Sequence, residues 1–172
     1  TTSKHAKARA TRRMLESYHG KEDPLAVKKA WPFLSNEDYH IRYAARLALE
    51  WQDSKSWANQ AYAEIDDLAA IHALLGLARS DLAGSLKPSV DRLLKVDFDQ
   101  LDKTGKLALL RTYSVIMSRG GTPDTNQVLA IGEQLDPFFP SSDDNLNEEL
   151  CRVLCFLEHP AVVRKTIALM KT

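Results

Sequence analysis

The sequence has few cysteines and no long apolar run, which argues against a disulfide framework and against a membrane-spanning helix. Only two of its 172 residues are cysteine, too few for the disulfide framework of a small secreted domain. The longest apolar stretch, residues 73–78, is much shorter than a bilayer-spanning helix. Lys and Arg together number 23, as do Asp and Glu, so the formal net charge is zero. This balance argues against the strongly basic surface of a general nucleic-acid-binding protein.

Recognisable catalytic motifs are also missing from the sequence. It has no His-Glu-x-x-His, no Gly-x-Ser-x-Gly and no glycine-rich phosphate loop. The acidic stretch from Asp97 looks like a calcium loop, but Asp102 replaces the required glycine and Ala108 the required glutamate. We therefore expect a protein that is not an enzyme, with no catalytic residue and no cofactor.

Helical periodicity runs through almost the whole chain, whereas the alternation typical of strands is nearly absent. The clearest pattern covers residues 35–51, where Ser35 and Asp38 are expected to form a capping box ahead of one apolar stripe. Three more long helices are expected at about residues 66–80, 103–118 and 143–158. Each long helix is preceded by a shorter one, and the expected short helices cover about residues 24–31, 57–64, 86–96 and 123–135, with a last helix at 161–170.

Alternating short and long helices with short connections predict an array of helical hairpins. Asp23-Pro24 and Thr122-Pro123 are expected to start two of the short helices, because proline fits the first helical position. The long helices share a loose pattern of spaced aliphatic residues that repeats every 30 to 40 residues or so. The predicted fold is an all-α superhelix of about four hairpins plus a terminal helix, in one domain covering residues 1–172.

The segment SNEDYHIRYAARLALE, residues 35–50, resembles the second helix of a HEAT repeat, in which an acidic turn precedes Ile-Arg and spaced alanines. The resemblance implies an armadillo-like α-solenoid. It also implies that Asp38 and Arg42 take part in a ladder of contacts between successive repeats.

Three segments are similar to the helical region of certain large exported bacterial proteins: residues 19–34, 41–57 and 147–170. Those proteins also carry a propeller-like, sugar-dehydrogenase-type domain and a c-type cytochrome domain. The likeness implies an exported or periplasmic location, although the chain has no Cys-x-x-Cys-His for haem attachment. The chain begins Thr-Thr-Ser, from which we expect no signal peptide in this stretch and expect the chain to be part of a longer polypeptide.

Tyrosine and arginine side chains gather on the face opposite the apolar stripes of the long helices. In HEAT-like arrays this row usually lines the concave surface, and both residue types are enriched in interface hot spots. The candidate partner-binding residues are Tyr39, Tyr43, Arg46, Arg111 and Arg152. The alternative interpretation is a solvated face with local ion pairs such as Arg46–Glu50 and Glu148–Arg152.

Cys151, Cys155 and His159 follow one another at intervals of four residues, which would place them on one helical face. Thiolates and an imidazole could bind zinc or copper. The interpretation that we favour is no metal site, with the cysteines packed as small apolar residues, because no fourth ligand is evident.

These patterns favour a non-catalytic module that binds a protein partner or spaces neighbouring domains of the same chain, without membrane insertion. An alternative is a nucleic-acid-binding HEAT-like domain of the DNA glycosylase type. A third is a metal or redox module around Cys151 and Cys155. The zero net charge disfavours the nucleic-acid alternative.

Overall fold

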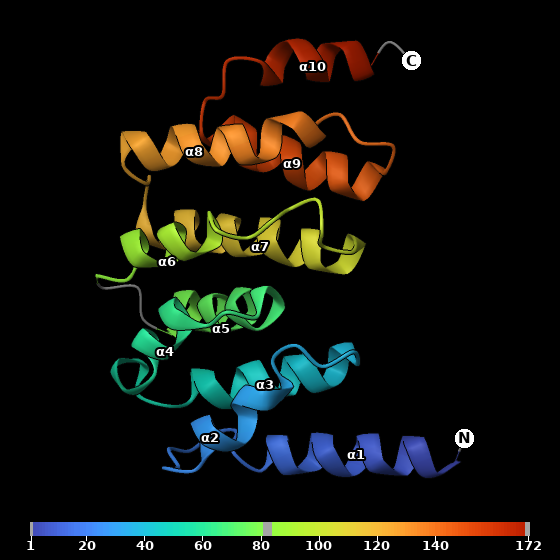
Figure 1. Ribbon diagram of the computed structural model, residues 1–172, viewed down its shortest axis with the longest axis vertical. Helices are drawn as coiled ribbons and strands as arrows, with labels where there is room; N and C mark the ends of the chain where they lie inside the picture. Colours follow the sequence, from blue (N-terminus) through green and yellow to red (C-terminus); the bar gives the residue numbers. More distant parts are fainter. Residues whose placement is uncertain (1, 81–83, 171–172) are drawn as a thin grey trace. The chain divides into compact units, whose positions relative to one another are not determined.

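The computed structural model describes residues 2–80 and 84–170, and over these residues it is all-helical (Figure 1). The predicted all-α class is therefore confirmed. No helix in these two ranges is both long and apolar enough to cross a membrane. The α-helices are α1 (Thr2–Glu16), α2 (Ala26–Ala30), α3 (Tyr39–Glu50), α4 (Ala58–Ala63), α5 (Asp67–Ser80), α6 (Leu86–Leu93), α7 (Lys103–Gly120), α8 (Thr125–Leu135), α9 (Asp144–Phe156) and α10 (Val162–Leu169).

The chain divides into two compact units, Thr1–Ser85 (unit 1) and Leu86–Thr172 (unit 2). In unit 1, α2 pairs with α3 and α4 pairs with α5. In unit 2, α6 pairs with α7 and α8 with α9, while α10 packs on α9. The four predicted hairpins and the terminal helix are thus present. A superhelical curvature and a single-domain organisation stay predictions.

The long helices of unit 1 lie side by side and run in the same direction. Helix α3 contacts both α1 and α5. The Arg79 guanidinium at the end of α5 donates to both carboxylate oxygens of Glu50 at the end of α3, at 3.1 and 3.2 Å. Helix α5 is buried continuously from Ala69 to Ala78, as expected for a helix that is apolar nearly all round.

Ion pairs join the starting residues of neighbouring helices in unit 2. Lys103, the first residue of α7, pairs with Asp143, the N-cap of α9. Lys87 at the start of α6 pairs with Asp124, the N-cap of α8, at 2.8 Å. Because equivalent ends meet, α7 runs parallel to α9 and α6 runs parallel to α8.

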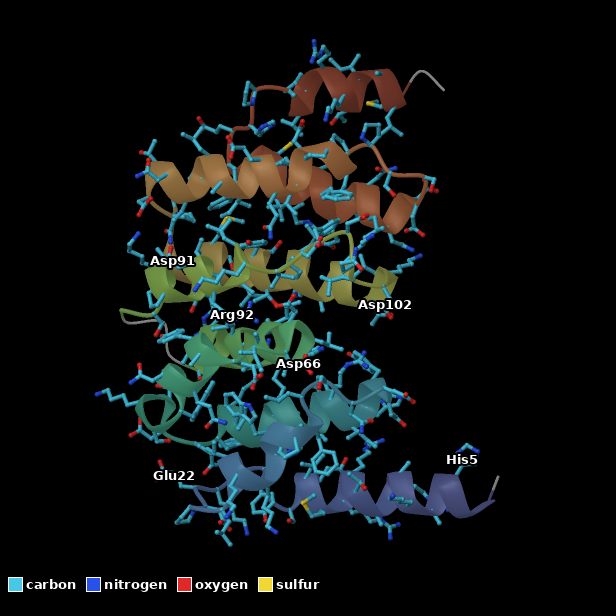
Figure 2. The ribbon with its side chains drawn as sticks, in the orientation of Figure 1. His5, Glu22, Asp66, Asp91, Arg92 and Asp102 are labelled. Carbon is cyan, nitrogen blue, oxygen red and sulfur yellow. The ribbon has the colours of Figure 1, made fainter. Side chains whose placement is uncertain are left out.

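Two glutamines of α8 join it to the other helices of unit 2. The Gln134 amide donates to the carbonyls of Leu93 and Val96 at 3.2 and 2.9 Å, and its oxygen accepts the hydroxyl of buried Tyr113 at 2.8 Å. The Gln127 amide donates to Asp91 at 2.7 Å; Asp91 is labelled on α6 in Figure 2. These bonds satisfy polar groups at the helix contacts, where an unpaired group would cost stability.

The start of α3 differs from the prediction. The N-cap is Asp38, whose backbone is extended and whose carboxylate accepts the amide of His40 at 2.8 Å. The helix begins at Tyr39, so the predicted capping box with Ser35 is wrong. A single aspartate at the cap position already satisfies a free amide of the first turn.

The two proline dipeptides lie just outside the helices that they were expected to start. The N-cap of α8 is Asp124, not Thr122, so Pro123 precedes the cap instead of occupying the first helical position. Asp23 caps a turn before α2 by accepting the amide of Leu25 at 2.9 Å. In both places an aspartate close to the helix is the acceptor that defines the local start.

Removing the cap of α7 tests this account of the helix starts. Asp102, labelled in Figure 2, accepts the amide of Gly105 at 2.7 Å. We expect Asp102→Ala to lower the free energy of unfolding by about 1 kcal/mol in urea denaturation. Asp99→Ala, in the exposed loop before the cap, is the matched control and should change it by less than about 0.5 kcal/mol. Equal effects of the two substitutions would contradict the assignment.

Candidate functional site

The five predicted partner-binding residues belong to two local surfaces, one in each unit. Tyr39, Tyr43 and Arg46 lie on α3 in unit 1. Arg111 lies on α7 and Arg152 on α9, both in unit 2. The structure brings Arg111 and Arg152 to one pocket, and it separates Arg46 from the exposed surface.

Tyr39 and Tyr43 form an exposed aromatic pair, which we call the tyrosine surface. They are 56% and 42% exposed, and their rings stack with centroids 6.2 Å apart. The Cζ atom of Arg46 lies 5.1 Å from the Tyr43 ring centroid, and that of Arg42 lies 6.0 Å from the Tyr39 centroid. Both guanidinium groups are within cation–π range of the rings, which favours this arrangement of the two tyrosines. Both tyrosines line a pocket of about 250 Å³ together with Arg12, Glu16, His19, His40, Ala44 and Leu47.

Arg46 is buried, so the predicted place of its side chain on an exposed partner-binding face is wrong. It is 7% exposed, and its Nη1 donates to the Glu50 carboxylate one turn further along α3. Arg79 of α5 also pairs with Glu50. The wheel position of Arg46 faces away from the apolar stripe, but α5 covers that side of the helix. Arg46 therefore supports the tyrosine surface from below and stabilises the α3–α5 contact.

Arg42 and Asp38 act at the start of their own helix. The buried Arg42 guanidinium donates through Nη1 to the carbonyl oxygens of Asn36 at 2.6 Å and Glu37 at 3.1 Å. Asp38 caps the same helix. These bonds fix the loop that precedes α3. In the part of the chain that the structure describes, neither side chain hydrogen-bonds to another helix pair, and a ladder between repeats stays a prediction.

His72 of α5 lies in the same buried region, and sequence patterns alone did not single it out. It is 6% exposed, and neither ring nitrogen has a hydrogen-bond partner among the described residues. Burial, together with the positive charges of Arg42 and Arg46, lowers the pKa of His72 to about 4. The imidazole is therefore neutral near pH 7. A histidine inside an otherwise apolar helix is the signal that could have drawn attention to it.

The second surface is a pocket between α7 and α9, which we call the arginine pocket. It encloses about 370 Å³ and is lined by Arg111, Ser114, Val115, Met117, Ser118, Arg152, Val153 and Phe156. Val115, Met117 and Val153 are buried and form its apolar base. Phe156 is 45% exposed, and it lies outside the apolar stripe of α9. A large exposed aromatic residue off that stripe is a signal that sequence analysis missed.

The two arginines of this pocket differ in their electrostatic surroundings. Arg152 donates to Glu148 at 2.8 Å and to Glu149 at 2.5 Å, so its charge is largely balanced. Within the described residues, no ion pair is found for the exposed Arg111. The pocket thus combines an uncompensated cation with an apolar base.

His159 does not share a helical face with the two cysteines. Helix α9 ends at Phe156, and Glu158 has a left-handed backbone with φ of 53°. The turn carries the His159 ring onto Gly132 of α8, with Nδ1 3.5 Å from a carboxylate oxygen of Asp136. The predicted series at intervals of four is therefore wrong at its third member.

Cys151 and Cys155 do lie together on α9. Their Sγ atoms are 3.8 Å apart, and the Cys151 sulfur is 3.5 Å from the Thr166 hydroxyl of α10. Burial, and then the neighbouring Cys151 thiol, raise the pKa of Cys155. Over residues 2–80 and 84–170, no group of three or more His, Cys, Asp and Glu side chains is placed to hold a metal ion.

Comparison of the chain with models of protein families, with curated proteins and with solved structures finds no match. The functional proposal is therefore based on the positions and contacts of the residues described above.

The different roles of Arg46 and Arg111 can be separated by their effects on stability. Arg46→Ala removes a partner of a nearly buried carboxylate and the packing of the arginine stem, so we expect a loss of about 3 kcal/mol in unfolding free energy. Arg111→Ala removes an exposed side chain without an ion pair and should cost less than about 0.5 kcal/mol. Denaturant titration of both variants measures the difference. Similar losses would show that Arg46 is not a buried support.

Buried His72 predicts a loss of stability in mild acid. Its folded pKa of about 4 lies below the ordinary value of 6.5, so the unfolded chain binds a proton first as the pH falls. The stability that His72 contributes is therefore complete above pH 6.5 and is lost as the pH falls towards 4. By pH 4.5 we expect His72 to account for a loss of about 2 to 3 kcal/mol in the free energy of unfolding, because its pKa is lowered in the folded protein.

Urea denaturation between pH 7 and pH 4.5 measures this loss, and His72→Leu is the matched variant. The variant has no imidazole to protonate, so its unfolding free energy should fall less with pH than that of the wild type. An identical pH dependence in the two proteins would rule out His72 as its source.

Proposed function

We propose that this chain is a non-catalytic protein-interaction module whose arginine pocket binds an acidic and apolar segment of a partner protein. The observation that carries the proposal is the position of Arg111 and Arg152. They come from different helices, yet they line the same pocket above an apolar base. This grouping favours a recognition surface in unit 2 over a scatter of solvated charges.

The chemistry of the arginine pocket defines the partner segment. Arg111 offers a planar set of donors that fits a carboxylate, and no ion pair with a described residue occupies it. The apolar base and the exposed Phe156 ring favour an apolar side chain next to that carboxylate. A volume of about 370 Å³ accommodates a few side chains, which suits an anchor residue and its neighbours.

Repeat spacing supports a HEAT-type module as the scaffold. The ion pairs Lys87–Asp124 and Lys103–Asp143 connect equivalent helix starts that are 37 and 40 residues apart. HEAT and armadillo units repeat at about 40 to 47 residues, and stacked units of this kind present long binding surfaces. In unit 1 the tyrosine surface supplies a second candidate contact, with two rigid aromatic rings of low conformational entropy.

The partner is either a separate protein or a neighbouring domain of the same polypeptide. The second arrangement fits the likeness to the helical region of large exported bacterial proteins. In that arrangement the arginine pocket binds the adjoining domain and fixes its position, so the same contact serves both the interaction role and the spacer role.

Charge reversal in the arginine pocket tests the proposal. Wild type, Arg111→Glu and Arg119→Glu are immobilised and exposed to an array of peptides in which acidic and apolar residues are varied. Arg119 is an exposed arginine of the same helix that does not line the pocket. We expect peptides with adjacent acidic and apolar residues to bind wild type and Arg119→Glu, and to lose at least about tenfold in affinity for Arg111→Glu.

Binding that falls equally in Arg111→Glu and Arg119→Glu would indicate a general charge effect and would contradict recognition in the pocket. Failure of every peptide to bind wild type would remove the interaction proposal and leave the spacer role.

A further inference from the structure

The two cysteines of α9 are arranged as a pair of donors on one helical face. One turn of helix separates them, and their sulfur atoms are 3.8 Å apart. Both thiols are free, and Cys155 is exposed while Cys151 is partly buried. An ion can therefore reach the pair from solvent through Cys155 and meet the second sulfur at once.

The distance between the sulfur atoms suits two bonds to one metal ion. Zinc–sulfur bonds of about 2.3 Å place two sulfur atoms about 3.8 Å apart at a tetrahedral angle and about 4.6 Å apart in a line. The observed separation matches the tetrahedral value, and a two-coordinate ion bound in a line needs the two sulfur atoms further apart. Rotation of the exposed Cys155 side chain about its Cα–Cβ bond can widen the gap without moving the helix backbone.

The number of available ligands decides which metal ion the pair can bind. Structural zinc sites are almost always four-coordinate, and the described residues supply no third or fourth His, Cys, Asp or Glu next to the pair. His159, the nearest candidate in sequence, lies against Gly132 and Asp136 instead. Cu(I) is a soft ion that thiolates select, and two thiolates can satisfy it.

We propose that Cys151 and Cys155 form a two-thiolate binding site for Cu(I). Binding breaks the two S–H bonds and forms two Cu–S bonds, and both protons pass to solvent. No electron is transferred, because copper enters and remains as Cu(I). The site is independent of the arginine pocket, whose lining contains neither cysteine.

Competition with a coloured Cu(I) chelator tests the site. Reduced protein is titrated without oxygen against the Cu(I)–bicinchoninate complex, with ascorbate present to keep the copper reduced. We expect wild type to withdraw one Cu(I) per chain. Cys151→Ser and Cys155→Ser should each bind about 100-fold more weakly or worse, because the second sulfur acts at high effective concentration.

Two controls make the result specific. His159→Gln should keep the wild-type affinity, since the imidazole lies away from the sulfur pair. Circular dichroism checks that each variant keeps the helix content of the wild type, and Cys151→Ala replaces Cys151→Ser if the serine variant unfolds.

Three results would overturn the proposal. These are no uptake by wild type, equal affinity in either single-cysteine variant, and loss of copper binding when an equal amount of zinc is added. The first two exclude a paired thiolate site, and the third excludes its selectivity for Cu(I).

Discussion

Parallel stacking of successive long helices, α3 on α5 in unit 1 and α7 on α9 in unit 2, is the arrangement on which the surface features depend. A short helix with an apolar stripe cannot bury that stripe alone, so its neighbour must supply the other half of the core. Stacking also covers part of each helix that a helical wheel assigns to solvent. The residues that remain exposed after stacking, and not those that merely face away from the stripe, make up the available binding surface.

The charged residues of each unit follow from this constraint. Where α5 covers α3, Arg46 and Glu50 lose most of their contact with water and must pair with each other. Arg42 reaches backbone carbonyls, while His72 beside it remains neutral. Between α7 and α9 the covering is incomplete, and the gap becomes the arginine pocket. The same parallel packing of long helices thus buries Arg46 beneath the tyrosine surface in unit 1 and leaves Arg111 accessible in unit 2.

Much of the fold could be predicted from the sequence, because hydrophobic periodicity and helix breakers are local signals. The long helices appear close to their expected positions, and Tyr39, Tyr43, Arg111 and Arg152 are exposed as expected. The exact starts were missed where an aspartate such as Asp38 or Asp124 became the cap. Arg46 and His159 were misplaced for a different reason. The burial of Arg46 depends on which helix packs over it, and that is not a local signal. The position of His159 depends on the left-handed backbone of Glu158, which follows the end of α9 and turns His159 away from the helical face of Cys151 and Cys155.

The central claim, that the arginine pocket recognises an acidic and apolar segment, is tested most directly by amide chemical shifts. Isotope-labelled protein is titrated with a peptide that places a glutamate next to a phenylalanine. The account predicts that the chemical-shift changes are concentrated at the pocket-lining parts of α7 and α9, residues 111–118 and 152–156. The residues of the tyrosine surface line a different pocket and should not shift together with them. Shifts that are absent from these residues, or spread evenly over exposed arginines and lysines, would contradict it.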